Sequence, residues 1–135
     1  MSGIPPAEIP RPRTLRLKDG RDYELRPLQA GDAALVVAFF NSLSPATIRS
    51  RYGYLIHDMT PERAHRLVAC DPARELPLGI IERDDDGREV LRAMGRLVHA
   101  PDGLSAECAF VVHDDRRHLG MASRLLLHLR AAGRQ

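Results

Sequence analysis

The chain has 135 residues, of which 44% are hydrophobic and 28% are charged, and its formal net charge at pH 7 is +2. These values are ordinary for a single globular domain with enough residues to bury a core. The low net charge gives no electrostatic reason to expect a nucleic-acid partner. No apolar run is long enough to span a membrane, and the first residues, MSGIPPAEIPRPR, lack the apolar core of a secretory signal. We therefore expect a cytoplasmic protein that does not enter a membrane.

The N-terminal segment, residues 1–13, is predicted to be a disordered or extended arm. It contains four of the ten prolines and shows no hydrophobic periodicity. Polar and apolar residues then alternate in residues 14–17 and 23–26, and Asp19 and Gly20 lie between the two stretches. This pattern predicts a β-hairpin at the start of a domain that covers residues 14–135.

Helices are predicted after this hairpin. Asp32 is expected to cap the first helix, and Ser44-Pro45 and Thr60-Pro61 have the composition of further helix starts. The inward faces are expected to carry Leu35, Val36, Phe39, Phe40 and Leu43 in the first of these helices, and Ala64, Leu67 and Val68 in the last. Residues 49–54, RSRYGY, could form a small nucleic-acid patch, but a solvated face near a substrate cleft is favoured.

Three strands are predicted next. Residues 76–82 and 89–99 are joined by Asp-Asp-Asp-Gly at 84–87, which favours a hairpin turn over a calcium site. The third strand, 106–112, reads AECAFVV and contains Glu107 among apolar residues. No metal site is expected, because His57 and His65 lack partners at ligand spacing. Cys70 and Cys108 are predicted to be buried free thiols.

Residues 113–133 combine a polar turn with an amphipathic helix that is expected to stop at Gly133. Its apolar face is expected to carry Leu119, Ala122, Leu125, Leu126, Leu129 and Ala132. Arg116, Arg117 and His118 fall where the first helical turn is expected, and a helix N-terminus disfavours cations unless an anion is bound. A phosphate would resolve this conflict. The alternative is a solvated basic cap, with Asp114 and Asp115 as counter-ions.

Residues 117–122, RHLGMA, resemble the Arg/Gln-x-x-Gly-x-Gly/Ala signature of the GCN5-related N-acetyltransferase (GNAT) family. The stretch follows a strand and opens a helix, as in that family. Residues 25–27 followed by Gly31-Asp32 resemble the usual start of a GNAT domain. Residues 41–45, 49–52, 70–75 and 105–107 resemble a subgroup related to protein-lysine acetyltransferases, which are often fused to acyl-CoA synthetase-like domains. The resemblance implies an α+β (mixed α/β) fold with a mostly antiparallel central sheet flanked by helices.

The resemblance also implies that acetyl-CoA is the co-substrate. The family binds its pantetheine arm to the end of the strand, which corresponds here to Phe110, Val111 and Val112. It binds the pyrophosphate to the following loop. The matching positions in this chain are Arg117, His118, Leu119, Gly120, Met121 and Ala122. Many members have glycine where this chain has His118, which either crowds the phosphates or adds a donor to them.

Glu107 is the expected general base. A carboxylate among apolar neighbours has a raised pKa, and the period of a strand places Glu107 on one face with Ala109 and Val111. The resemblance implies the same role, in a direct transfer of acetyl to an amine, with protein lysine as the preferred acceptor. His99 and His113 are lesser candidates. The alternative is that Glu107 faces water at a frayed strand start.

The resemblance implies further strands and a helix, with the general acid, beyond the position of Gln135. On this reading the domain is truncated at its C-terminal side. The strand edge at 108–112 would then be unpaired, which favours a homodimer through it. Two alternatives remain: a non-catalytic acyl-CoA-binding or regulatory module, and, more weakly, a nucleic-acid-binding domain, which the net charge disfavours.

Overall fold

The computed structural model describes residues 11–44, 59–69, 74–100 and 106–133, without the side chains of residues 106–107 and 131–133. Its five-stranded sheet has the order β1-β2-β3-β4-β5, and every neighbouring pair is antiparallel. The strands are β1 (Arg13–Arg16), β2 (Asp22–Pro27), β3 (Glu75–Arg83), β4 (Glu89–His99) and β5 (Ala106–Val112). The mixed α/β fold with an antiparallel sheet is therefore confirmed.

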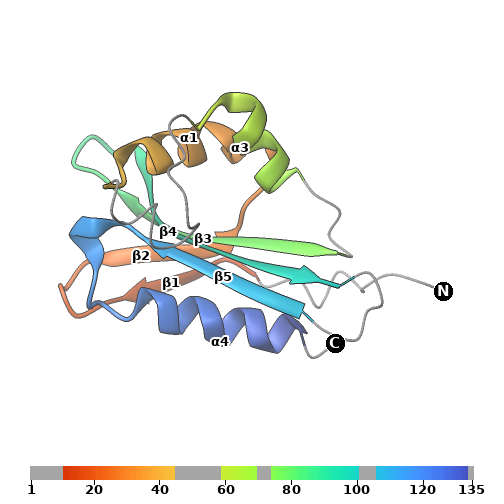
Figure 1. Cartoon of the computed structure of the whole chain (residues 1–135). Helices are drawn as coiled ribbons and strands as arrows, with labels where there is room; N and C mark the ends of the chain where they lie inside the picture. Colours follow the sequence, from red (N-terminus) through yellow and green to blue (C-terminus); the bar gives the residue numbers. More distant parts are fainter. Residues whose placement is uncertain (1–10, 45–58, 70–73, 101–105, 134–135) are drawn as a thin grey trace.

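Helices cover both faces of the sheet (Figure 1). Helices α1 (Ala33–Ser42) and α3 (Pro61–Val68) lie on one face, and α4 (Met121–Gly133) lies on the other. Two short 3-10 helices, η2 (Ala30–Asp32) and η3 (Asp114–Arg116), precede α1 and α4. Among the described ranges, no helix is long and apolar enough to cross a membrane.

The hairpin turns form where the sequence predicts them. In the β3–β4 turn, Asp84 Oδ1 accepts the N–H groups of Asp86 and Arg88, both at 2.9 Å. Gly87 completes the turn with φ +80, a conformation that L side chains rarely adopt. Because Asp84 folds back on its own backbone, the acidic run is explained as a turn, as expected.

A β-bulge interrupts the pairing of β3 with β4. Ile80 pairs with Ala93, whereas Ile81 pairs with Leu91, so Arg92 is an extra residue in β4. The Arg92 carbonyl accepts the N–H of His113 at 2.8 Å, just beyond the end of β5. The bulge therefore contacts the segment that leads to α4.

The helix starts agree only in part with the sequence. Thr60 caps α3, because its hydroxyl accepts the Arg63 N–H at 3.2 Å and Pro61 follows it, as predicted. Asp32 precedes α1, but its side chain makes no capping hydrogen bond to that helix. Its carboxylate instead accepts two hydrogen bonds from Arg26, at 2.8 and 3.0 Å, and the Gln29 N–H at 2.8 Å, ahead of η2. The prediction that Asp32 caps α1 is therefore wrong, because Arg26 and Gln29 engage its carboxylate.

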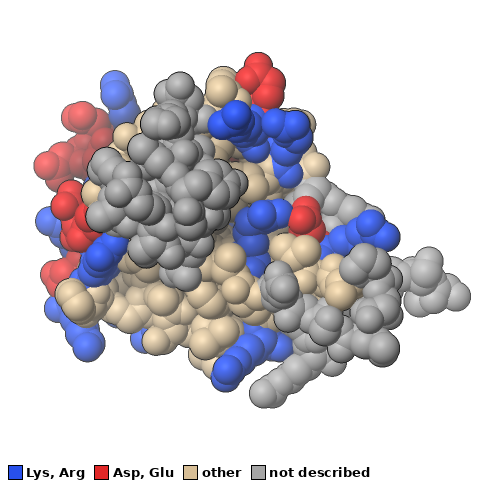
Figure 2. Space-filling model, in the orientation of Figure 1, with Lys and Arg blue, Asp and Glu red and all other residues tan. Residues whose placement is uncertain are grey.

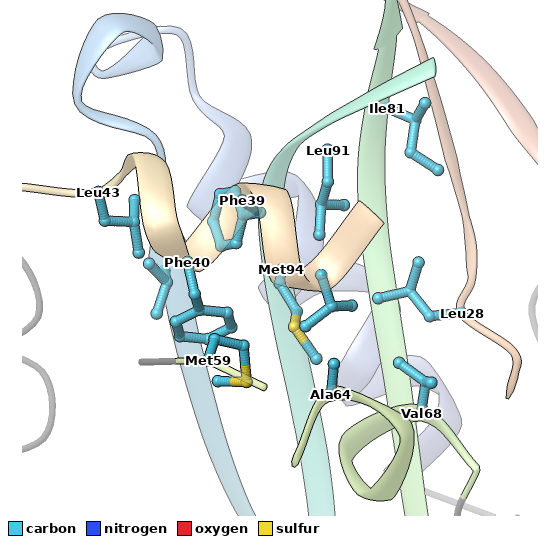
Figure 3. Packing of buried hydrophobic residues seen from close by; sticks show 12 residues of the cluster. Leu28, Phe39, Phe40, Leu43, Met59, Ala64, Val68, Ile81, Leu91 and Met94 are labelled. Carbon is cyan, nitrogen blue, oxygen red and sulfur yellow. The ribbon is translucent and has the colours of Figure 1, made fainter. Parts of the chain in front are cut away.

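One hydrophobic cluster fills the space between the sheet and helices α1 and α3. Figure 3 shows Phe39 and Phe40 of α1 in one cluster with the sheet residues Leu91 and Met94 and the α3 residue Ala64. The two phenyl rings meet edge to face, with centroids 5.4 Å apart. These aromatic residues are core residues, as predicted.

The second cluster lies between the sheet and α4. Among the described side chains of the helix, residues 121–130, the fully buried ones are Met121, Leu125 and Leu129. The face is therefore shifted from the predicted one, because Ala122 is exposed and Leu126 is only half-buried. A Cβ on Gly95 of β4 would lie 3.2 Å from Leu129 Cδ1, so α4 packs directly on the strand at this glycine.

Strand β5 is the last strand of the described sheet. Cys108 is exposed in it, so the prediction of a buried thiol is wrong there. The reason is that a terminal strand is shielded by only one neighbour. Cys70 lies outside the described residues. The homodimer through this edge stays a prediction.

Candidate functional site

The residues that resemble the GNAT acetyl-CoA site gather where β5 ends and α4 begins. Phe110 and Val112 pack into the cluster under α4, whereas Val111 is buried in the cluster under α1. All three pair with β4: Phe110 lies opposite Gly95, Val111 opposite Met94, and Val112 opposite Ala93. The end of β5 is therefore packed against a hydrophobic cluster on each face of the sheet. The connection to α4 starts from this packed strand.

The connection between β5 and α4 is not a helical turn. Arg116 ends η3, and Arg117 is extended, with φ −74 and ψ 161. Helix α4 begins only at Met121. The expectation that Arg116, Arg117 and His118 lie in the first helical turn is therefore wrong, because the backbone of His118 (φ +66) and Gly120 (φ +83) leaves the right-handed helical region.

The left-handed conformation of His118 shows what the departure from the GNAT signature costs. The left-handed conformation costs most L residues about 1–2 kcal/mol, whereas glycine has no Cβ and adopts it without this steric cost. This is the position at which many GNAT members have glycine. The His118 side chain is exposed. Histidine in place of glycine at this position therefore costs free energy through its backbone conformation and not through burial of its side chain.

Gly120 faces open space. A Cβ built on it would have no heavy atom within 4 Å. The next residue, Met121, opens α4, and the first N–H groups of a helix have no acceptor within the helix. Together with the helix dipole, these groups attract an anion. An anionic group could therefore approach the backbone closely at this point.

The connection is attached to both sides of the molecule. Asp114 Oδ2 accepts the Ser44 N–H at 2.8 Å, just beyond α1. Asp114 Oδ1 pairs with the half-exposed Arg117 at 3.1 Å. Asp114 is therefore a counter-ion of a basic residue in this connection, as the alternative to a phosphate site expects. The neighbouring His113 is buried, and its Nδ1 accepts the Asp115 N–H at 3.1 Å. That nitrogen is therefore engaged in the loop, which weakens His113 as a candidate base.

A buried carboxylate, Glu82 of β3, holds Arg116. The Nε of Arg116 lies 3.0 Å from Glu82 Oε1, and its Nη2 lies 3.3 Å from Oε2. Arg21 donates to Oε2 at 2.8 Å, and Arg92, the bulge residue, donates to Oε1 at 3.1 Å. We call these four residues the Glu82 cluster. It borders an open hollow of about 520 Å³.

The cluster shifts the pKa values of its members. Burial would raise the pKa of Glu82, but hydrogen bonds from Arg116 and Arg21 and the charges of Arg116 and Arg92 outweigh burial and lower it. Nearby, burial and a hydrogen bond to Asp19 raise the pKa of Tyr23 to about 12. The sequence analysis missed Glu82. The only signal was a lone acid at the end of an apolar strand.

The backbone of the candidate base, Glu107, lies in β5 opposite Val98 of β4. Its side chain lies outside the described residues, so its role stays a prediction. His99 ends β4 opposite Ala106, also as a candidate only. In the part of the chain that the structure describes, no group of three or more His, Cys, Asp or Glu residues could hold a metal ion.

Basic and acidic side chains lie intermixed over the face seen in Figure 2, with uncharged side chains among them. This mixture agrees with the net charge of only +2.

No protein-family model matches the chain. Acetyltransferase PA5475 of Pseudomonas aeruginosa is 31% identical over 114 residues, which are 84% of this chain and 60% of that protein. The crystal structure of the GNAT domain of S. lividans PAT superimposes with a TM-score of 0.78 and 24% identity, covering 97% of this chain and 74% of that one. The chain has a GNAT fold.

A second solved structure is more distant. A cAMP-binding acyltransferase from Mycobacterium smegmatis (E234A mutant) matches with a TM-score of 0.51 and 21% identity, and this chain covers 33% of it. The comparisons support the GNAT family that the signature at 117–122 indicated. They do not bear on a fusion to an acyl-CoA synthetase-like domain. The chain spans about 60% of the length of the P. aeruginosa relative.

Proposed function

We propose that the chain is an acyltransferase domain that moves acetyl from acetyl-CoA to an amine, with a protein lysine side chain as the preferred acceptor. The observation that carries the proposal is the connection from Arg117 to Met121. Two residues with positive φ, an open Gly120 and the start of α4 occur together there. Similarity to an acetyltransferase and to a GNAT domain supports the same activity.

In this proposal the pyrophosphate and the pantetheine arm of acetyl-CoA bind to different residues. The pyrophosphate binds at the backbone of residues 117–122, and Arg117 adds positive charge beside it. The pantetheine arm lies along the backbone of Phe110, Val111 and Val112. This arrangement would place the thioester beside β5, the strand that carries Glu107.

The chemistry requires a neutral amine and a stabilised oxyanion. Glu107 takes the proton of the ammonium group, directly or through water. The amine nitrogen then attacks the thioester carbonyl, the C–N bond forms, and the C–S bond breaks. The attacking nitrogen loses its surplus proton, the departing thiolate takes up one proton, directly or through water, and the products are the amide and CoA. A backbone N–H near Val111 is the proposed donor to the oxyanion.

Acetyl-CoA binding tests the loop. Isothermal titration of the wild type should show saturable binding, and Gly120→Asp should abolish it, because a carboxylate would fill the open space and repel the phosphates. Gly87→Asp is the matched control, since Gly87 has nearly the same φ and equally open surroundings in a different turn. Equal binding by the wild type and Gly120→Asp would overturn the phosphate-loop assignment.

Turnover tests Glu107. Acetylation of a lysine-containing peptide should fall about 100-fold or more in Glu107→Gln while acetyl-CoA binding is retained, because general-base catalysis contributes about 10²–10⁴-fold. Binding without turnover in the wild type would favour the alternative, a non-catalytic acyl-CoA-binding module. A Glu107→Gln variant with unchanged turnover would remove the residue from the mechanism.

A further inference from the structure

We propose that Glu82 and Arg116 form a latch that fixes the conformation of the connection between β5 and α4, so that acyl-CoA binding depends on an ion pair outside the binding loop. This inference rests on the proposed function for its ligand. Arg116 is assigned as a positioning residue, because its guanidinium faces Glu82 on the sheet while the residue after it opens the candidate loop.

The geometry of the pair suits a latch. Glu82 and Arg116 are 34 residues apart in sequence and make two hydrogen bonds through a forked contact. Their side chains are 8% and 16% exposed, so water competes weakly for the bonds. A bidentate guanidinium–carboxylate contact fixes direction as well as distance. The position of Arg116 is therefore set by β3.

The conformation that follows Arg116 needs such support. His118 has a positive φ that is unfavourable for a residue with a Cβ. Strained residues of this kind persist where their surroundings over-determine the backbone. Arg116 fixes the connection on the α4 face, and Asp114 fixes it beside α1 through Ser44. Loss of the Arg116 contact would let residues 117–120 relax away from their present path.

The composition of the cluster offers a matched control. Arg21 makes an equally short bond to Glu82, at 2.8 Å, but it lies in the β1–β2 turn and not in the connection. Arg116→Ala and Arg21→Ala each remove one of the three guanidinium partners and leave Glu82 with two. Only Arg116→Ala also frees the loop. The pair therefore separates positioning from general stability.

The first experiment is acetyl-CoA titration of the whole chain. Arg116→Ala should weaken binding about fivefold or more, whereas Arg21→Ala should stay within about twofold of the wild type. Arg116→Lys should give an intermediate affinity, because lysine restores the charge without the fork. Equal weakening in Arg116→Ala and Arg21→Ala, or unchanged affinity in both, would overturn the latch.

The second experiment does not need a ligand. Amide hydrogen exchange should be faster at residues 117–125 in Arg116→Ala and unchanged there in Arg21→Ala. If the wild type fails to bind acetyl-CoA but exchange changes in this way, the proposed function fails and the latch stands. If exchange at 117–125 is the same in both variants, the latch is overturned whether or not acetyl-CoA binds.

Discussion

The β3–β4 turn and the β5–α4 connection both contain positive φ, and they are held in opposite ways. The β3–β4 turn closes on itself, because Asp84 accepts the N–H groups of two residues that follow it within four positions. The β5–α4 connection depends on distant partners. Asp114 binds Ser44, 70 residues away, and Arg116 binds Glu82, 34 residues away.

The difference separates a turn that only joins strands from a connection with a fixed place in the fold. The shape of the β3–β4 turn is fixed by hydrogen bonds within the turn itself and does not depend on other parts of the fold. The β5–α4 connection is positioned relative to β3 and to the end of α1, so its backbone can present groups to a ligand in a defined direction. In the β3–β4 turn the residue with positive φ is a glycine, whereas the β5–α4 connection also accommodates His118 in a left-handed conformation.

The largest expected effect comes from breaking the distant support. Glu82→Ala should lower the free energy of unfolding by about 3–5 kcal/mol, because three guanidinium groups lose their shared carboxylate. Chemical denaturation measures this. Asp85→Ala, at an exposed position of the self-contained turn, should change stability by about 0.5 kcal/mol or less. Similar losses in the two variants would contradict the contrast.

Acid should act on the same support, with a smaller effect, because a protonated carboxyl keeps part of its hydrogen bonding. The pKa values of Glu82 and Asp32 are lowered in the folded chain. Their contribution to stability is therefore present above their unfolded pKa values, about 4, and is lost as the pH falls through the lower folded values. Melting temperatures between pH 7 and pH 3 should fall less steeply for Glu82→Gln than for the wild type.

A pair of glycine substitutions compares the two connections directly. Gly87→Ala and Gly120→Ala should each cost about 1–2 kcal/mol, since both residues have positive φ and neither added Cβ would meet a neighbour within 4 Å. Denaturation should show similar losses. Acetyl-CoA affinity should fall only in Gly120→Ala, and a comparable fall in Gly87→Ala would contradict the assignment of the binding loop.

The smallest expected effect is a gain. His118→Gly should raise the free energy of unfolding by about 1 kcal/mol or less, because relief of the left-handed backbone is offset in part by the greater freedom of glycine in the unfolded chain. Arg117→Gly, next to it but with φ −74, should instead be destabilising. Thermal denaturation distinguishes these signs, and a loss in His118→Gly equal to that in Arg117→Gly would show that His118 is not strained.

Much of the fold follows from local patterns. Alternation predicted β1 and β2, a short apolar run predicted β5, Asp19-Gly20 and residues 84–87 predicted the hairpins, and Thr60-Pro61 predicted the start of α3. The errors arose where a distant partner or a neighbour in space decided the outcome. Asp32 binds Arg26 and does not cap α1, and Cys108 lies on a strand with one described neighbour.

The candidate site divides in the same way. Phe110, Val112 and residues 117–122 are close in sequence, so their proximity in space could be predicted. The Glu82 cluster could not, because it depends on the register of β3 against β4 and on the path of the connection after β5. The start of α4 was misplaced because the backbone conformation of His118 is not evident from its residue type.

The bulge at Arg92 has a consequence for the comparison of related chains. Leu91 belongs to the cluster under α1 and Ala93 to the cluster under α4, so the residue between them adds a side chain without exchanging the faces of its neighbours. A relative shorter by this one residue could pair the same flanking positions in a continuous ladder. A single-residue gap at this column of an alignment would therefore preserve the architecture while removing one arginine from Glu82.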